Sequence, residues 1–167
     1  MKRSVLISSL CVMLFVGCST TEKPHYEEPL PREVPAVCKE VLPAYDADPE
    51  TISKVLTLFS DRADLVRGLR EGWRPSGDYT RPARFPSRPL FFTPARAVRE
   101  GKSGSSRVVL VVDNTGHVVE ARLLSASDPV FEKATLEISS KWIFQPALQN
   151  ARRIWSVVIA SLEFPKE

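Results

Sequence analysis

The sequence predicts an α+β fold, in which one helix covers a small antiparallel sheet of three strands. Two runs of mainly aliphatic residues, 107–113 (RVVLVVD) and 117–125 (HVVEARLLS), flank the turn sequence Asn114-Thr115-Gly116 and indicate a β-hairpin. A third run, residues 154–164 (IWSVVIASLEF), indicates the last strand. Between them Asp128-Pro129 is typical of a helix start, and apolar residues follow at helical spacing, namely Phe131, Ala134, Ile138 and Trp142. The expected order is β-β-α-β.

The first residues of the chain are typical of a signal peptide. Basic residues precede an apolar run at residues 5–16, which is shorter than the roughly 20 residues that a membrane-spanning helix needs. The residues Leu14-Phe15-Val16-Gly17-Cys18 resemble a lipobox, at which bacterial lipoproteins are acylated on cysteine and cleaved. We therefore expect a lipoprotein signal peptide at residues 1–17 and lipidation of Cys18. An ordinary signal peptide with an incidental cysteine, or an uncleaved anchor, is the alternative.

The resemblance to lipoproteins also implies a location. Ser19 follows the cysteine, and by analogy with lipoprotein sorting this favours the periplasmic face of the outer membrane. Fatty acyl chains such as palmitate hold a protein firmly, because each buried methylene contributes about 0.8 kcal/mol. Loss of residues 1–17 removes Lys2 and Arg3, so the net charge falls from +3 to +1 and nucleic acid is not an expected partner.

Three segments precede the predicted sheet. Residues 18–47 are rich in proline and glutamate, so we expect a disordered tether. With Cys11 cleaved away and Cys18 lipidated, Cys38 would have no cysteine for an intrachain disulfide, which leaves a tolerated thiol or an intermolecular disulfide. Residues 48–73 have helical spacing in two runs, which predicts a helical hairpin or one bent helix, with an apolar face that packs on the domain that follows. The two runs are Ile52, Val55, Leu56 and Phe59, then Leu65, Val66, Leu69 and Trp73.

Residues 74–87 are predicted to be a basic linker rich in proline and arginine, and this composition continues to residue 99. Residues 74–99 contain six arginines and one acidic residue, Asp78. Solvated charges on a spacer are the favoured interpretation. The alternative is attraction to anionic surfaces of the cell wall or membrane, which would make the chain a structural tether between membrane and peptidoglycan.

Residues 88–165 contain a series of short signals in a fixed order. They are a short helix at Pro94-Ala95-Arg96-Ala97, Gly104 before the first strand, the turn Asp113-Asn114-Thr115-Gly116, and Trp142-Ile143-Phe144-Gln145-Pro146 at the end of the main helix. In this order they resemble the C-terminal domain of TonB-type energy transducers. The resemblance implies a TonB-like domain at residues 88–167. The sequence departs from the family in two ways. It has a predicted lipoprotein signal instead of a transmembrane helix, and its entry segment reads Phe91-Phe92-Thr93-Pro94 instead of Tyr-Pro.

The resemblance further implies a protein-interaction module linked to TonB-dependent transport, since domains of this family bind extended peptides by strand addition at a sheet edge. We place the partner-binding edge on the last strand, at Ile154, Trp155, Val157 and Ile159. That strand is apolar on both faces, so it needs a second cover. Residues 49–72, a partner, or a second copy of the chain in a homodimer could supply it.

We do not expect an enzyme. Beyond the signal peptide the histidines are His25 and His117, and no nucleophile–base set, metal-ligand spacing or phosphate loop accompanies them. We expect no cofactor and no metal. The expected partner is a periplasmic or outer-membrane protein.

Overall fold

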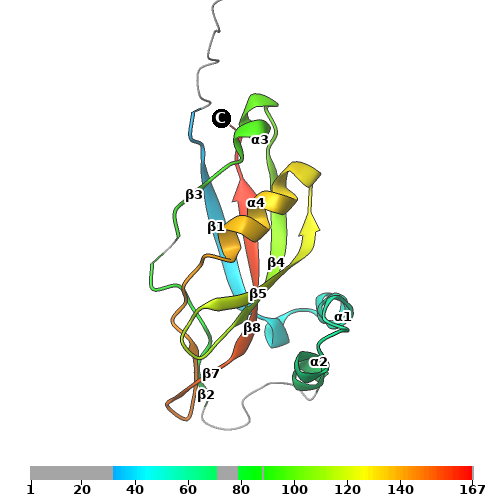
Figure 1. The fold of residues 1–167 in the computed structure, drawn as a ribbon, viewed down its shortest axis with the longest axis vertical. Helices are drawn as coiled ribbons and strands as arrows, with labels where there is room; N and C mark the ends of the chain where they lie inside the picture. Colours follow the sequence, from blue (N-terminus) through cyan, green and yellow to red (C-terminus); the bar gives the residue numbers. More distant parts are fainter. Residues whose placement is uncertain (1–31, 71–78, 88, 167) are drawn as a thin grey trace, which may run out of the picture. The chain divides into compact units, whose positions relative to one another are not determined.

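Strand β8 (Ser156–Phe164) lies inside a five-stranded sheet, not at its edge. The computed structural model describes residues 32–70, 79–87 and 89–166. Its larger sheet has the strand order β3-β1-β8-β4-β5 (Figure 1). The other strands of this sheet are β1 (Pro35–Pro43), β3 (Phe91–Phe92), β4 (Gly104–Val112) and β5 (Val118–Ala126). The predicted α+β class is confirmed, but the three predicted strands form only part of the sheet.

Strand β1 is the main departure from the sequence prediction. The expectation of a disordered tether is wrong for residues 35–43, which pair with β8 in antiparallel orientation. Pro35 and Pro43 stand at the two ends of the strand, where a missing N–H is tolerated. The short 3₁₀ helix η1 (Ala44–Asp46) follows directly. The rest of the predicted tether, residues 18–31, and the predicted signal peptide lie outside the described residues.

One face of the sheet packs against α4 (Pro129–Ser139), with α3 (Ala95–Arg99) beside it (Figure 1). We call this the α4 face. Phe131 of α4 stacks on Phe164 of β8, with ring centroids 4.7 Å apart. Trp142 just beyond α4 is buried, as predicted for a core residue. Buried residues of this core also include Ala36, Phe91, Ala97, Val108, Leu110, Val112, Phe144, Val158, Ala160 and Leu162.

The opposite face of the sheet packs against α1 (Pro49–Leu58) and α2 (Ala63–Arg70). We call it the hairpin face. The buried residues of this second core are Ala44, Val55, Phe59, Leu65, Val109, Val111, Val157 and Ile159. The predicted helical hairpin and its packing on the sheet are therefore confirmed for residues 49–70. The chain itself supplies the second cover that the apolar last strand required.

Local signals explain how these elements begin and turn. The side chains of Asp48 and Asp128 cap α1 and α4 by accepting backbone N–H groups at 2.9 Å, and a proline follows each cap, as predicted. Between β4 and β5 the Asp113 carboxylate accepts the N–H of Gly116 at 2.9 Å. Gly116 has a φ of +99°, and a Cβ there would lie 2.0 Å from the Phe144 carbonyl oxygen. The tight turn therefore requires glycine.

A smaller sheet joins β2 (Tyr79–Arg81), β6 (Ala147–Gln149) and β7 (Arg152–Ile154) in the order β2-β6-β7. The predicted basic linker is wrong for residues 79–87, because β2 pairs with β6 and the Arg84 N–H donates to the Gln145 carbonyl at 3.1 Å. Residues 74–78 lie outside the described residues. The predicted last strand is divided, since Ile154 ends β7 and β8 starts at Ser156.

Candidate strand-addition edge

Strand β8 is the most regular strand of the larger sheet. It pairs with β4 at nine consecutive positions, from Gly104 opposite Phe164 to Val112 opposite Ser156. Its other side pairs with β1, from Val37 opposite Glu163 to Pro43 opposite Val158. A regular strand presents its backbone donors and acceptors at even spacing, so it is well suited to receive another strand.

The side chains of β1 hold it to β8 weakly. Ala36 is its one fully buried side chain, and Cys38 and Val41 are partly buried against the α4 face. Lys39 forms an ion pair with Glu163 of β8, but 59% and 44% of the two side chains are exposed to solvent. Such exposed pairs contribute little to stability, because water screens them. Backbone hydrogen bonds therefore supply much of the attachment of β1.

The two outer edges of the larger sheet are protected against strand addition. The pairing of β5 with β4 shifts register twice, which leaves Val119 and Leu124 as extra residues on β5. On the outer side of β1, β3 covers Pro35 and Ala36, and the register of β1 itself shifts between Cys38 and Glu40. Bulges and prolines are common means of protecting an edge strand. The edge of β8 that β1 covers is therefore the best strand-accepting edge of the larger sheet.

The structure separates the four residues predicted to bind a partner. Val157 and Ile159 are 4% and 2% exposed and face the α1–α2 helices. Ile154 is half-buried and Trp155 is 45% exposed, and both line a groove of about 450 Å³ beside α2. The prediction of an exposed edge strand is wrong for Val157 and Ile159, because their strand β8 lies between β1 and β4. Ile154 instead ends β7, an outer strand of the smaller sheet, and Trp155 lies between β7 and β8.

Sequence reasoning missed the residues that meet at the covered edge. Lys39 and Glu163 flank it on the hairpin face, while Ala36 and Cys38 lie toward the α4 face. One signal could have found them. Val34, Ala36 and Cys38 are apolar at a spacing of two residues, which is typical of a half-buried strand.

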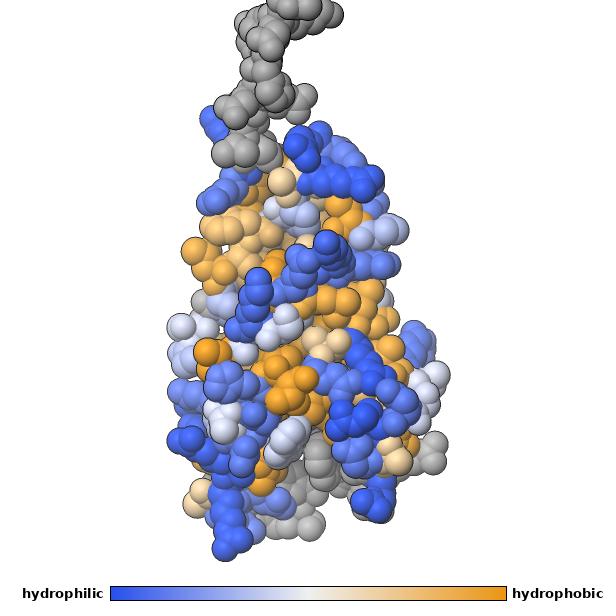
Figure 2. Space-filling view, in the orientation of Figure 1, coloured by the Kyte–Doolittle hydropathy of each residue, from blue (hydrophilic) through white to orange (hydrophobic). Residues whose placement is uncertain are grey.

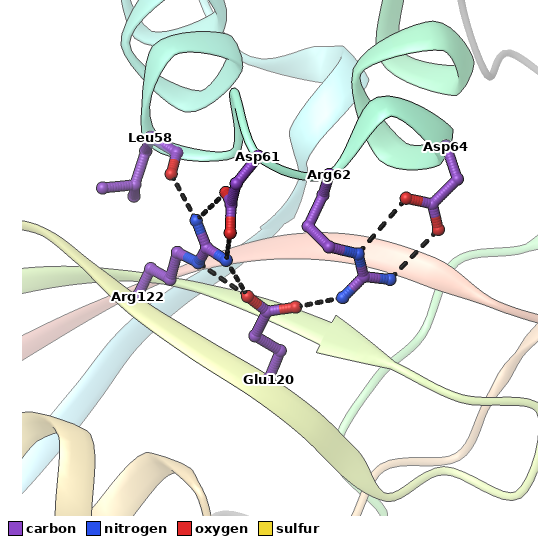
Figure 3. Close-up of polar contacts among 6 residues, drawn as sticks. All are labelled: Leu58, Asp61, Arg62, Asp64, Glu120 and Arg122. Carbon is purple, nitrogen blue, oxygen red and sulfur yellow. Dashed lines mark hydrogen bonds and ion pairs between the residues drawn. The ribbon is translucent and has the colours of Figure 1, made fainter.

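The α1–α2 helices are fixed over β8 and β4 by a network of charges (Figure 3). Arg122 of β5 donates to the Leu58 carbonyl at 2.6 Å and to the Asp61 carboxylate at 2.8 Å. Its guanidinium also lies 4.4 Å from the centre of the Phe59 ring. Glu120 accepts from Arg122 and from Arg62. The hairpin face is therefore closed by charge pairing as well as by apolar packing.

The charge network lowers the pKa of its carboxylates. The hydrogen bond from Arg122 is the main cause that lowers the pKa of Asp61, and the hydrogen bond from Arg62 does the same for Asp64. The pKa of Arg122 is raised, chiefly by its hydrogen bond to Asp61. These groups therefore stay charged at neutral pH, which keeps the helices on the sheet.

Apolar residues also reach the surface on the α4 side. The face that carries α4 shows apolar patches divided by hydrophilic residues (Figure 2). Leu90 and Ile143 are exposed and line a groove of about 540 Å³ between the segment before β3 and the end of α4.

Within the described residues, no three His, Cys, Asp or Glu side chains gather closely enough to hold a metal ion. None of the helices described there has the length and hydropathy of a membrane span. Cys18 lies outside the described residues.

Comparison with known proteins assigns the C-terminal part of the chain. Residues 93–164 match the family described as the Gram-negative bacterial TonB protein C-terminal. No curated protein and no solved structure matches the chain. The matched residues contain α3, β4, β5, α4 and β8 but not β1. This part of the chain therefore belongs to the family of TonB C-terminal domains, which mediate protein–protein interactions in the cell envelope.

Proposed function

We propose that the chain is an outer-membrane lipoprotein, lipidated at Cys18, whose TonB-like domain binds an extended segment of another envelope protein by strand addition to β8. One observation carries the proposal. The family match contains a sheet of β8, β4 and β5, in which β8 is an edge strand, and β1 from outside the match is added to that edge. The chain thus places its own segment where a partner strand would lie.

The chemistry of the edge defines what it can bind. Backbone N–H and C=O groups of β8 would pair with any extended segment, and the side chains would select among segments. Toward the α4 face the incoming strand meets a core that accepts small apolar residues, as it does Ala36 and Cys38. Toward the hairpin face it meets Ser161 and Glu163, which suit polar or basic residues. Such a module fits a role linked to TonB-dependent transport.

A photo-crosslinking residue placed at Glu163 in cells tests this site. We expect it to capture an envelope protein, because Glu163 borders the edge of β8. The matched control is the same residue at Val119, which is 49% exposed on the protected edge strand β5. Capture from position 119 and not from position 163 would place the interaction at a different edge and contradict the proposal.

A structural tether between membrane and peptidoglycan is the alternative. It depends on free basic side chains at residues 74–99. In the described part of this stretch Arg96 donates to Glu100 at 2.7 Å and Arg84 donates to the Gln145 side chain at 2.9 Å. These contacts favour a structural role for the arginines. Salt-sensitive binding to purified peptidoglycan that is lost after neutralisation of Arg81 and Arg99 would support the tether instead.

A further inference from the structure

We infer that residues 35–38 of β1 form a gate, which covers one end of the β8 edge and must leave before a partner strand binds. This inference rests on the proposed function and concerns how its site is opened. It follows from a difference between the two halves of β1. The register shift between Cys38 and Glu40 divides the strand at Lys39.

The half of β1 after Lys39 is firmly anchored. It continues directly into η1, whose Ala44 is 1% exposed in the core of the hairpin face. The next helix, α1, contributes Val55 and Phe59 to the same core. Release of residues 40–43 would therefore disturb the packing of α1 on the sheet.

The half of β1 before Lys39 has few such anchors. Its outer neighbour β3 is two residues long, and the side chain of Val37 is 43% exposed. Its contribution to the core is the small buried side chain of Ala36 together with the partly buried Cys38. Local opening needs less free energy where few apolar groups are buried, so this half separates before the rest of the sheet.

Opening of the gate would expose the end of β8 around Leu162 and Glu163. Leu162 lies opposite Cys38 and is otherwise almost completely buried. An incoming strand with small apolar residues in the places of Ala36 and Cys38 would cover this surface again. The gate therefore selects for an extended segment that resembles residues 35–38 themselves.

A disulfide between Cys38 and Leu162→Cys tests the gate in the full-length chain. The two residues are direct partners across the β1–β8 pair. Partners in antiparallel strands have Cα atoms about 4.5–5.5 Å apart, which suits a disulfide. Oxidation locks the gate, the reduced form of the same variant is the control, and peptide mass mapping verifies the bond. The probe is a synthetic peptide of residues 33–43 with Ser in place of Cys38.

We expect the reduced variant to bind the probe at least about ten times more tightly than the oxidised one, because a locked strand cannot yield its place. A second variant, Lys39→Glu, opens the gate without altering a buried side chain, since it places a second carboxylate beside that of Glu163. It should bind the probe roughly three to five times more tightly than the unaltered chain. Lys54→Glu on α1, an exposed lysine paired with Glu50, is the control for the change in charge.

The outcomes separate the gate from the proposed function. Equal binding of the probe by the oxidised and reduced forms would overturn the gate but leave a strand-binding site elsewhere. Absence of binding in every form, Lys39→Glu included, would overturn strand addition at β8 as well. Binding by the reduced form and by Lys39→Glu, with loss on oxidation, supports both.

Discussion

Arg122 donates to both oxygens of the Asp61 carboxylate and so joins the sheet to the turn between α1 and α2 (Figure 3). The same guanidinium donates to the carbonyl of Leu58 at the end of α1. One side chain on β5 therefore fixes both the end of a helix and the following turn. This contact keeps the hairpin face of the sheet covered.

Replacement of Arg122 with methionine should weaken this attachment. Arg122→Met keeps an apolar stem over Phe59 but removes the charged hydrogen bonds. Because 63% of the Asp61 side chain is exposed to water, which screens the charges, these bonds should contribute about 1 kcal/mol. We expect a loss of this size in the free energy of unfolding, measured by urea denaturation. Arg99→Met, at an exposed position on α3, is the control. Equal stability of both variants would show that apolar packing alone holds the helices.

The Asp61 contact also predicts a dependence on acid. Its pKa is lowered in the folded protein, chiefly by the hydrogen bond from Arg122. A carboxylate with a lowered folded pKa stabilises the fold above its unfolded pKa of about 3.9, and this contribution is lost as the pH falls through the lower folded value. Stability from neutral pH down to about pH 4 should therefore be insensitive to this group. Asp61→Asn should reduce the additional loss below pH 4, measured by thermal melts from pH 3 to 7. An unchanged acid profile in Asp61→Asn would contradict the assignment.

Proline substitutions distinguish an interior strand from an edge strand. Ile159 of β8 has Leu42 and Val109 as register partners on its two sides, so Ile159→Pro should unfold the domain. Val119 is an extra residue at a bulge of the edge strand β5, and Val119→Pro should leave the domain folded. Circular dichroism of the two variants provides the comparison. A folded Ile159→Pro variant would refute the strand order that places β8 inside the sheet.

Substitution of Cys18 tests the proposed anchor. Cys18→Ala removes the thiol that would carry the lipid, so fatty-acid labelling of the chain should disappear and the protein should leave the membrane fraction. Labelling with a clickable fatty acid in cells measures this directly. Cys38→Ala is the matched control, because it removes a different cysteine of the chain. Labelling that persists in Cys18→Ala and disappears in Cys38→Ala would show that Cys38 carries the lipid.

Local patterns predicted the elements whose signals lie within a few residues. Asp128-Pro129 starts α4, and Gly116 permits the turn between β4 and β5, because a cap and a positive φ are properties of short segments. The order β-β-α-β followed from the same local signals. The helices at residues 49–70 followed from apolar spacing, although the pairing of Asp61 with Arg122, 61 residues away, could not.

Strand β1 could not be predicted from its composition. The prolines and glutamates of residues 18–47 indicate a tether, and the strand forms because β8 offers a regular backbone edge. The pairing of β1 with β8 also explains why the predicted partner-binding site differs from the structure. Val157 and Ile159 were expected at an open edge, but the strand that pairs there comes from more than 100 residues upstream. Strand propensity depends on a residue and its near neighbours in the sequence, whereas the pairing of β1 with β8 joins distant parts of the chain.

Amide hydrogen exchange in β1 shows whether this strand is a replaceable occupant of the β8 edge. In the full-length chain we expect Ala36, Val37 and Cys38 to exchange faster than Val41 and Leu42, and all of them faster than residues 108–111 of β4. On addition of the peptide of residues 33–43, exchange at positions 36–38 should accelerate further while that of β4 stays slow. Protection of residues 36–38 equal to that of β4, unchanged by the peptide, would show that β1 is a permanent strand of the sheet and contradict the account.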